Sequence, residues 1–220
     1  RRARRLRERI MPTLTVDGYP IAYAEAGSGT PLVMVHGTLG DQRSFAGQME
    51  AFGAKYHAVS ISLRHCWPDK WREDGDFTIA RHTADVAGFI RALGKGRVHL
   101  IGHSRGGHIA FRVAQHHPEL LASVVLLEPG GELDESLGGA PPAGIKEQRK
   151  PYARAEAAGI RTRTLLVGGD QSQPQFGRIL DALEGAMPNA RRVTIARAAH
   201  SVQADNAADF NAEVLKFLAG

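Results

Sequence analysis

Short apolar runs recur along this chain and alternate with longer segments of mixed polarity. Most of these runs have the length and the continuous apolar character of strands that are covered on both faces of a sheet. We therefore predict strands at residues 31–36, 58–63, 98–102, 123–127, 164–168 and 192–196.

Helices are predicted between these strands. The segment 78–93 begins with a threonine that can cap a helix and is followed by a glycine, while a proline ends the segment 105–117. Two more helices are predicted at residues 174–185 and 207–218. Near the N-terminus, alternating apolar and polar residues on both sides of Asp17-Gly18 indicate a β-hairpin.

Strands that alternate with helices indicate an α/β fold. The expected architecture is a mostly parallel sheet with helices on both faces, preceded by the antiparallel hairpin. In such a sheet the ligand lies beyond the carboxyl ends of the strands. Reactive residues should therefore occur directly after strands.

Length and charge narrow the function classes. A chain of 220 residues suits one domain, which we place at residues 11–220, and no apolar run reaches the roughly 20 residues of a membrane span. The net charge of +5 comes from residues 1–10, which hold six of the 28 basic and one of the 23 acidic residues. The other residues carry 22 charges of each sign. We therefore expect neither a nucleic-acid nor a membrane partner.

The first ten residues and the single cysteine give two further expectations. Because Met11 directly precedes the first strand-like segment, we expect it to be the natural start, and residues 1–10 to be a disordered or non-native basic tail. One cysteine, Cys66, cannot form an internal disulfide and is compatible with a reducing compartment. A cytoplasmic location is expected.

The segment Gly102-His103-Ser104-Arg105-Gly106 follows one predicted strand and opens the next helix. On such a sharp turn a serine is held in a strained backbone conformation with its hydroxyl above the sheet, and glycines two positions away avoid collisions. Ser104 is therefore the candidate nucleophile. A dinucleotide-binding loop is a weaker interpretation of the same residues, because its middle position should be glycine so that a pyrophosphate can approach the backbone.

Acyl transfer also needs two converging N–H donors for the developing oxyanion. The loop of residues 36–40 (HGTLG) ends an earlier strand, so the backbone amide of Thr38 can supply one donor and that of Arg105 the other. We expect His36 to stabilise its own loop rather than take part in the chemistry.

The candidate general base is His200, which follows the last predicted strand among small neighbours. Asp170, after a strand and two glycines, is the preferred acid for orienting this imidazole, and Glu128, after the preceding strand, is the alternative. No pair of histidines has convincing zinc-ligand spacing, so no metal is expected.

Four motifs now occur in a familiar order: HGTLG, GHSRGG, LLVGGD and AAHS. From about residue 13 to its end the sequence resembles the α/β-hydrolase superfamily. The resemblance implies an eight-stranded sheet, no cofactor, and hydrolysis of an ester or related acyl bond through an acyl-enzyme. It also implies a triad at Ser104, Asp170 and His200, with the His-Gly loop as the oxyanion segment.

One departure from the family concerns the helical cap that members often carry between the sixth and seventh strands. Only about 36 residues separate Glu128 from Thr164, and part of them is a loop rich in glycine and proline at 130–145. We predict a loop and a short helix, at 145–158, in place of a cap. Either the cap is naturally reduced, or it has been deleted near residues 138–144. An open cleft favours small, exposed esters.

A second loop at the strand ends could line the substrate pocket. Arg64, His65 and Trp67 follow a predicted strand, and Leu39 lies in the oxyanion loop. The alternative for the first three is a packed loop anchored by the tryptophan.

The sequence thus predicts a carboxylesterase-type serine hydrolase that acts on a small-molecule ester without a cofactor. A non-catalytic binding protein of the same fold is the alternative, and labelling by a fluorophosphonate separates the two. An uncapped cleft leaves apolar surface that a second subunit could cover, so a homodimer is possible.

Overall fold

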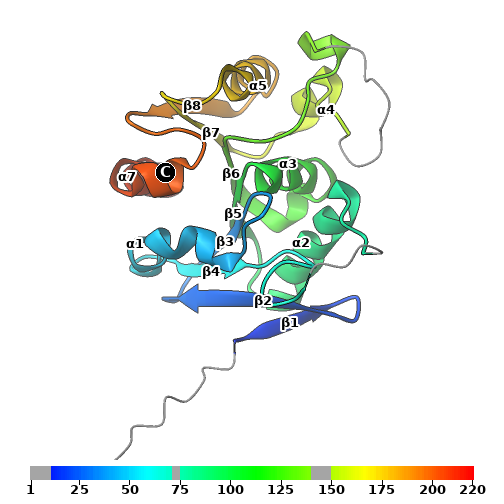
Figure 1. Cartoon of the computed structure of the whole chain (residues 1–220), viewed down its shortest axis with the longest axis vertical. Coiled ribbons are helices and arrows are strands. Elements are labelled where there is room, and N and C mark those ends of the chain that lie inside the picture. The colour runs from blue at the N-terminus through cyan, green and yellow to red at the C-terminus, as the bar shows by residue number, and fades with distance from the viewer. Residues whose placement is uncertain (1–10, 71–74, 140–149) are drawn as a thin grey trace, which may run out of the picture.

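The computed structural model describes residues 11–70, 75–139 and 150–220. Its centre is an eight-stranded sheet with the strand order β1-β2-β4-β3-β5-β6-β7-β8 (Figure 1). The hairpin β1–β2 joins β4 in antiparallel pairing, and all other neighbours are parallel. The strands are β1 (Thr13–Val16), β2 (Tyr19–Ala26), β3 (Pro31–Val35), β4 (His57–Ile61), β5 (Val98–His103), β6 (Leu121–Leu127), β7 (Thr164–Gly169) and β8 (Ala190–Ile195).

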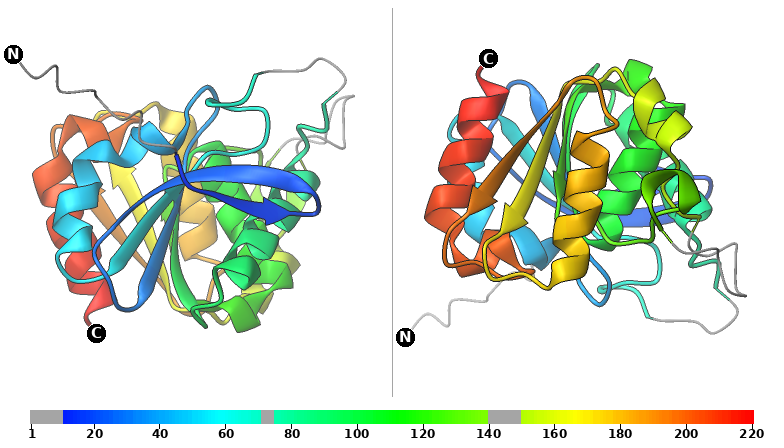
Figure 2. Two further views of the ribbon diagram at one scale, coloured as in Figure 1. Left: turned by 90° about the horizontal axis from the view of Figure 1, so that it is seen from below. Right: turned by 90° about the horizontal axis from the view of Figure 1, so that it is seen from above.

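Helices cover both faces of this sheet, as the two end-on views of Figure 2 show. One face carries α1 (Met49–Gly53), α6 (Val202–Asp205) and α7 (Ala207–Leu218), and the other carries α2 (Ile79–Leu93), α3 (Arg105–His116) and α5 (Pro174–Glu184). The predicted α/β fold with a mostly parallel sheet is confirmed. Among the helices that the structure describes, none combines the length and the apolar character that a membrane span requires.

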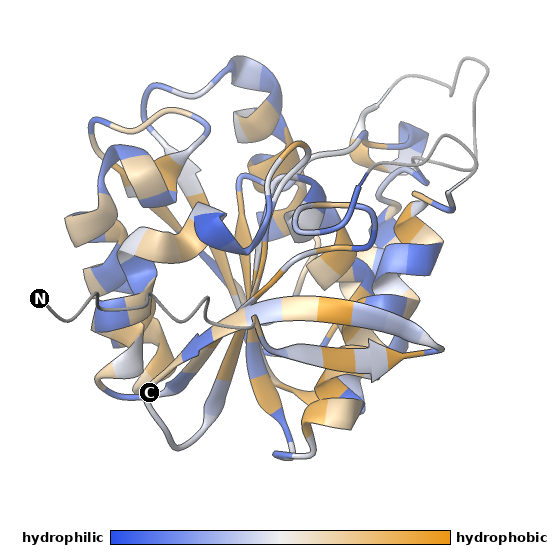
Figure 3. Cartoon of the chain, turned by 60° about the horizontal axis from the view of Figure 1, so that its bottom comes forward, coloured by the Kyte–Doolittle hydropathy of each residue, from blue (hydrophilic) through white to orange (hydrophobic). Residues whose placement is uncertain are grey.

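Alternating side chains of the central strands build two cores. Val33 and Val35 of β3 belong to the cluster under α2 and α3, whereas Leu32 and Met34 belong to the cluster under α1 and α7. All four side chains are fully buried, and burial of each stabilises the fold by roughly 1.5–3 kcal/mol. The strands are accordingly mostly apolar in Figure 3, while the helices combine polar and apolar residues. This two-sided core explains why these strands read as continuous apolar runs.

The segment between β6 and β7 is short, and the helix that the structure describes in it is shorter than the predicted helix at 145–158. Residues 145–149 lie outside the described part of the chain, and α4 (Arg154–Gly159) begins only after Pro151. Proline disfavours a helical conformation in the residue before it, which explains why Lys150 is not helical. The predicted basic tail at residues 1–10 also lies outside the described residues.

Buried contacts hold this segment against α3. The guanidinium of Arg112 donates to Glu156 (2.7 Å) and to the carbonyls of Lys150 and Pro151 (2.9 and 2.8 Å). Burial raises the pKa of Glu156, but hydrogen bonds from Lys150 and Arg112 outweigh it and lower that pKa to about 2. The fully buried Tyr152 packs beside α3 and its hydroxyl donates to a backbone carbonyl. Residues 150–156 are therefore held against α3.

Candidate active site

Ser104 lies on the sharp turn between β5 and α3, with φ 52° and ψ −117°. A non-glycine residue in this region costs about 1–3 kcal/mol, so the surrounding contacts must hold it. The Ser104 amide donates to the carbonyl of Leu127 (2.9 Å), and its own carbonyl accepts from His108 (3.1 Å) and Gly130 (2.9 Å). The strained turn predicted for the nucleophile is thus present and fixed on both sides.

Two glycines make this turn possible, because the backbones approach each other too closely for a side chain. A Cβ atom on Gly102 would lie 2.0 Å from the carbonyl oxygen of Gly106. A Cβ atom on Gly106 would lie 2.2 Å from the carbonyl oxygen of Val35. The GxSxG spacing therefore reflects the packing of α3 against the sheet, which leaves Ser104 at the carboxyl end of β5.

Ser104 lines a pocket of about 390 Å³ together with Thr38 and Arg105. The backbone amide of Arg105 belongs to the first residue of α3, where N–H groups and the positive end of the helix dipole favour an anion. Its side chain points elsewhere: it donates to the carbonyl of Phe77 and lies 4.3 Å from the centre of that ring. The two residues predicted to form the oxyanion hole therefore meet at the candidate nucleophile, and the Arg105 side chain is occupied elsewhere.

His36 holds the oxyanion loop in place, as expected from the sequence. One ring nitrogen donates to the carbonyl of Gly37 (2.7 Å), and the other accepts from the amide of Leu63 (3.0 Å). Burial lowers the pKa of His36 to about 4, so the ring stays neutral and keeps these two roles. The loop packs tightly on the nucleophile, since a Cβ atom on Gly37 would lie 3.0 Å from the Cβ of Ser104.

His200 follows β8 and lies beside this pocket. Its ring stacks on Phe176 at a centroid distance of 4.0 Å, and Phe176 itself lines the pocket with Ser104. No hydrogen bond joins the Ser104 hydroxyl to the His200 ring within the described residues, which is common in ligand-free sites. The structure therefore brings the predicted base to the rim of the nucleophile's pocket.

The sequence missed one residue that positions His200. His103, directly before the nucleophile, donates from Nε2 to the carbonyl oxygen of His200 (2.8 Å), and the two rings lie 4.8 Å apart. Burial lowers the pKa of His103 to about 4 and keeps its ring neutral. The GxSxG motif accepts any residue at this position, so the motif itself could not predict this role of His103.

The carboxylate that contacts His200 in this structure is that of Glu128, the alternative acid, and not that of Asp170, the preferred one. Oε2 of Glu128 lies 3.3 Å from Nδ1 of His200, and its Oε1 accepts from the amide of Gly169 (2.8 Å). Glu128 is 1% exposed, directly after β6. Asp170 is exposed, and its carboxylate accepts from the amide of Ala198 (3.2 Å). Asp170 thus links the turn after β7 to the loop after β8.

The four residues predicted to line the substrate pocket do not line the pocket of Ser104. The Leu39 side chain is 98% exposed and projects from the oxyanion loop into solvent. Trp67 is exposed and packs against the guanidinium of Arg43, which lies 3.9 Å from its ring centre. Neither side chain contributes to the cavity.

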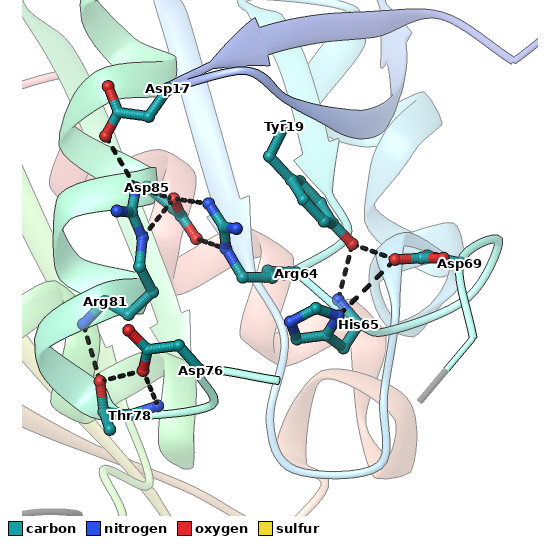
Figure 4. A network of polar contacts seen from close by, with 9 residues as sticks. All are labelled: Asp17, Tyr19, Arg64, His65, Asp69, Asp76, Thr78, Arg81 and Asp85. Carbon is teal, nitrogen blue, oxygen red and sulfur yellow. Dashed lines mark hydrogen bonds and ion pairs between the residues drawn. The ribbon is translucent and has the colours of Figure 1, made fainter. Parts of the chain in front are cut away.

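Arg64 and His65 belong to a polar network below the hairpin (Figure 4). Arg64 makes two 2.8 Å hydrogen bonds to the buried carboxylate of Asp85 and lies over the ring of Tyr19. The amide of His65 donates to the hydroxyl of Tyr19 (2.9 Å). Burial, together with the hydrogen bond to Asp69, raises the pKa of Tyr19 to about 12. Arg64 and His65 thus belong to a packed loop, as in the alternative interpretation, but Asp85 and Tyr19 anchor it and the exposed Trp67 does not.

A metal site is not evident where the structure describes the chain. Within residues 11–70, 75–139 and 150–220, no three or more histidine, cysteine, aspartate or glutamate side chains are grouped to suit a metal ion.

Known proteins are similar to this chain over part of their length. A protein of Mycobacterium bovis described as uncharacterized is 30% identical over 135 residues, which are 60% of this chain and 39% of that protein. The chain thus spans well under half of that relative's length. An esterase of Mycobacterium tuberculosis is 26% identical over 163 residues, covering 74% of this chain and 49% of the esterase.

Solved structures share the whole architecture. A bacterial membrane phospholipase A superposes with a TM-score of 0.84 at 21% identity, covering 96% of this chain and 86% of its own. Naproxen esterase from Bacillus subtilis gives a TM-score of 0.80 at 16% identity, covering 94% and 90%. At these identities the likeness shows the fold. The family described as alpha/beta hydrolase fold matches residues 30–158, more than half of the chain. The chain belongs to the α/β-hydrolase family.

Proposed function

We propose that this hydrolase cleaves carboxylic esters of small molecules through a covalent acyl-enzyme. One observation carries the proposal: the strained Ser104 shares a pocket with the first amide of α3, while the buried Glu128 holds His200 at the rim of that pocket. A nucleophile, an anion-binding backbone and an oriented imidazole are the parts that acyl transfer requires.

In the proposed reaction the hydroxyl oxygen of Ser104 attacks the ester carbonyl carbon, and Nε2 of His200 takes the hydroxyl proton. The amides of Thr38 and Arg105 stabilise the oxyanion. The C–O bond then breaks, and His200 returns the proton to the leaving alkoxide, which departs as an alcohol. Water attacks the acyl-enzyme in the same way and releases the acid. Glu128 accepts a hydrogen bond from Nδ1 throughout and stabilises the imidazolium.

The names of the related proteins support an ester substrate. They include an esterase, naproxen esterase, an N-acyl homoserine lactone degrading enzyme and an enol-lactonase. The pocket volume of about 390 Å³ is at the small end of ligand sites. Because only the short segment from 130 to 160 stands where many relatives carry a cap, we favour small esters that reach the site from solvent.

The test compares the wild-type protein with Ser104→Ala on p-nitrophenyl esters of increasing chain length. We expect hydrolysis of the short esters and a loss of roughly 10³-fold or more in kcat for the variant, since triad members act as a unit. Ser28→Ala is the matched control, because Ser28 is exposed on the turn after β2. A fluorophosphonate probe should label the wild type and the control only. Labelling of Ser104→Ala, or its near wild-type activity, would refute the proposal.

A further inference from the structure

His108 lies in the pocket of Ser104 but has no part in the proposed reaction. It is one helical turn beyond the nucleophile on α3, and its amide donates to the Ser104 carbonyl (3.1 Å). The side chain is buried, with 2% of the residue exposed, and it lines the cavity. A buried imidazole in the wall of a substrate pocket needs a chemical reason.

Arg112 fixes which nitrogen of His108 carries the proton. Its Nε–H donates to Nε2 of His108 at 3.3 Å, and a guanidinium has only donors, so Nε2 must be unprotonated. Burial, reinforced by the positive charges of Arg112 and Arg105, lowers the pKa of His108 to about 3, so the ring is neutral. A neutral imidazole with a free Nε2 lone pair carries its hydrogen on Nδ1. His108 therefore presents a fixed Nδ1–H donor.

Gly131 faces this donor closely, and a side chain there would crowd it. It also lines the pocket, at φ 129°, and a Cβ atom there would lie 3.1 Å from Nδ1 of His108. Tyr152 lies beside the imidazole with its ring centre 4.7 Å away, and its Cε2 would lie 3.0 Å from the same Cβ atom. Nδ1 thus lies close to Gly131 and Tyr152 at the wall of the cavity, where glycine at position 131 places no side chain over it.

About half of the surrounding wall is apolar, and the other half is polar. Ile79, Phe176 and Ile179 line the same cavity. A buried N–H without an acceptor costs about 1–3 kcal/mol, so a ligand that brings an oxygen to this point is favoured over one that brings a methylene group. The same argument explains why sites built to pair a polar group reject analogues that lack it.

We propose that His108 is a specificity-determining residue that selects esters with a second oxygen acceptor a few bonds from the scissile carbonyl. This inference rests on the proposed function. The Nδ1–H group donates to an ether, keto or second ester oxygen, whereas Ile79, Phe176 and Ile179 contact the carbon chain. Plain alkyl esters of the same length bind without this hydrogen bond.

The experiment uses two pairs of isosteric esters and measures binding separately from turnover. Methyl 3-methoxypropanoate is paired with methyl pentanoate, and 2-methoxyethyl butanoate with butyl butanoate, so that the added oxygen lies on the acyl or the alcohol side. Dissociation constants are measured by NMR titration of the Ser104→Ala protein with and without His108→Phe or His108→Asn. Phenylalanine keeps the ring packing, and asparagine keeps a donor near the Nδ1 position.

We expect at least one pair to favour the oxygenated ester by about 3- to 10-fold in Ser104→Ala, the range of one net hydrogen bond. His108→Phe should abolish this ratio and His108→Asn should retain most of it. Equal ratios with and without His108→Phe for both pairs would overturn the inference. Because each ratio compares two ligands on one protein, a partly destabilised variant still gives a valid answer.

Two further measurements remove the remaining ambiguity. If His108→Phe does not fold, the ¹⁵N resonance of Nδ1 in Ser104→Ala must still shift with a methoxy ester and not with its alkyl partner; equal responses would overturn the inference. If the wild type hydrolyses none of the four esters while the binding ratio depends on His108, the proposed function fails and the specificity inference stands.

Discussion

Replacing Glu128 by glutamine tests which carboxylate orients His200. Oε1 of Glu128 accepts from the Gly169 amide at 2.8 Å, so the amide oxygen of the glutamine must take that position. Its NH₂ group then faces Nδ1 of His200, which lies 3.3 Å from Oε2 in the native protein. An NH₂ group can only donate, so Nδ1 becomes an acceptor and the ring proton moves to Nε2. In that tautomer His200 cannot take the proton of Ser104.

The size of the effect follows from this wrong tautomer. The equivalent amide substitution in a serine protease triad lowers kcat about 10⁴-fold. The Glu128–His200 contact of 3.3 Å is longer than a strong charge-assisted bond of about 2.7–2.9 Å, so we expect a loss of about 10²- to 10⁴-fold. Asp170→Asn is the matched control: its side-chain oxygen can still accept from Ala198, and we expect less than about 3-fold change.

The assay is kcat on a short p-nitrophenyl ester at pH 7.5 for the wild type and both variants. Thermal melting of each protein shows whether the fold is retained. The reasoning fails if Asp170→Asn loses activity by 10²-fold or more while Glu128→Gln remains near wild type.

Two further predictions concern the oxyanion hole and the buried histidines. Gly130→Ala should lower kcat/KM about 10- to 100-fold, because the added Cβ would lie 3.4 Å from both the Arg105 amide nitrogen and the Ser104 hydroxyl. Gly47→Ala is the control, because the space around Gly47 is open. Equal kinetics of the two variants would contradict the prediction. Burial lowers the pKa of four histidines, His36, His82, His103 and His108, to about 3 or 4, so below pH 6.5 the unfolded chain binds protons that the folded chain does not. The free energy of unfolding should therefore fall as pH falls from 6.5 to 4, by about 1.4 kcal/mol per pH unit for each histidine. Urea unfolding that is unchanged between pH 7 and 5 would refute this prediction.

The family and the nucleophile could be predicted from local sequence. Strands buried on both faces must be continuously apolar, and a turn in which backbones approach within 2.0–2.2 Å of a side-chain position must carry glycine. The contact between Gly102 and Gly106 lies within the motif, whereas Gly106 also meets Val35 of the distant strand β3. Because the motif that satisfies both contacts is itself a short stretch of sequence, the order of elements and the position of Ser104 were readable. His200 followed from its place after the last strand.

Only the tertiary structure decided which distant side chains meet. Asp170 and Glu128 both follow strands and are equivalent in sequence, but burial, a hydrogen bond from Gly169 and the reach of the longer side chain select Glu128. His108 reads as an ordinary helical residue until Arg112 and Gly131 are seen on either side of its ring. The chain pattern thus determined the scaffold and the position of the candidate nucleophile, because these depend on short stretches of sequence. The acid and the pocket wall depend on contacts between residues far apart in sequence, which no local pattern encodes.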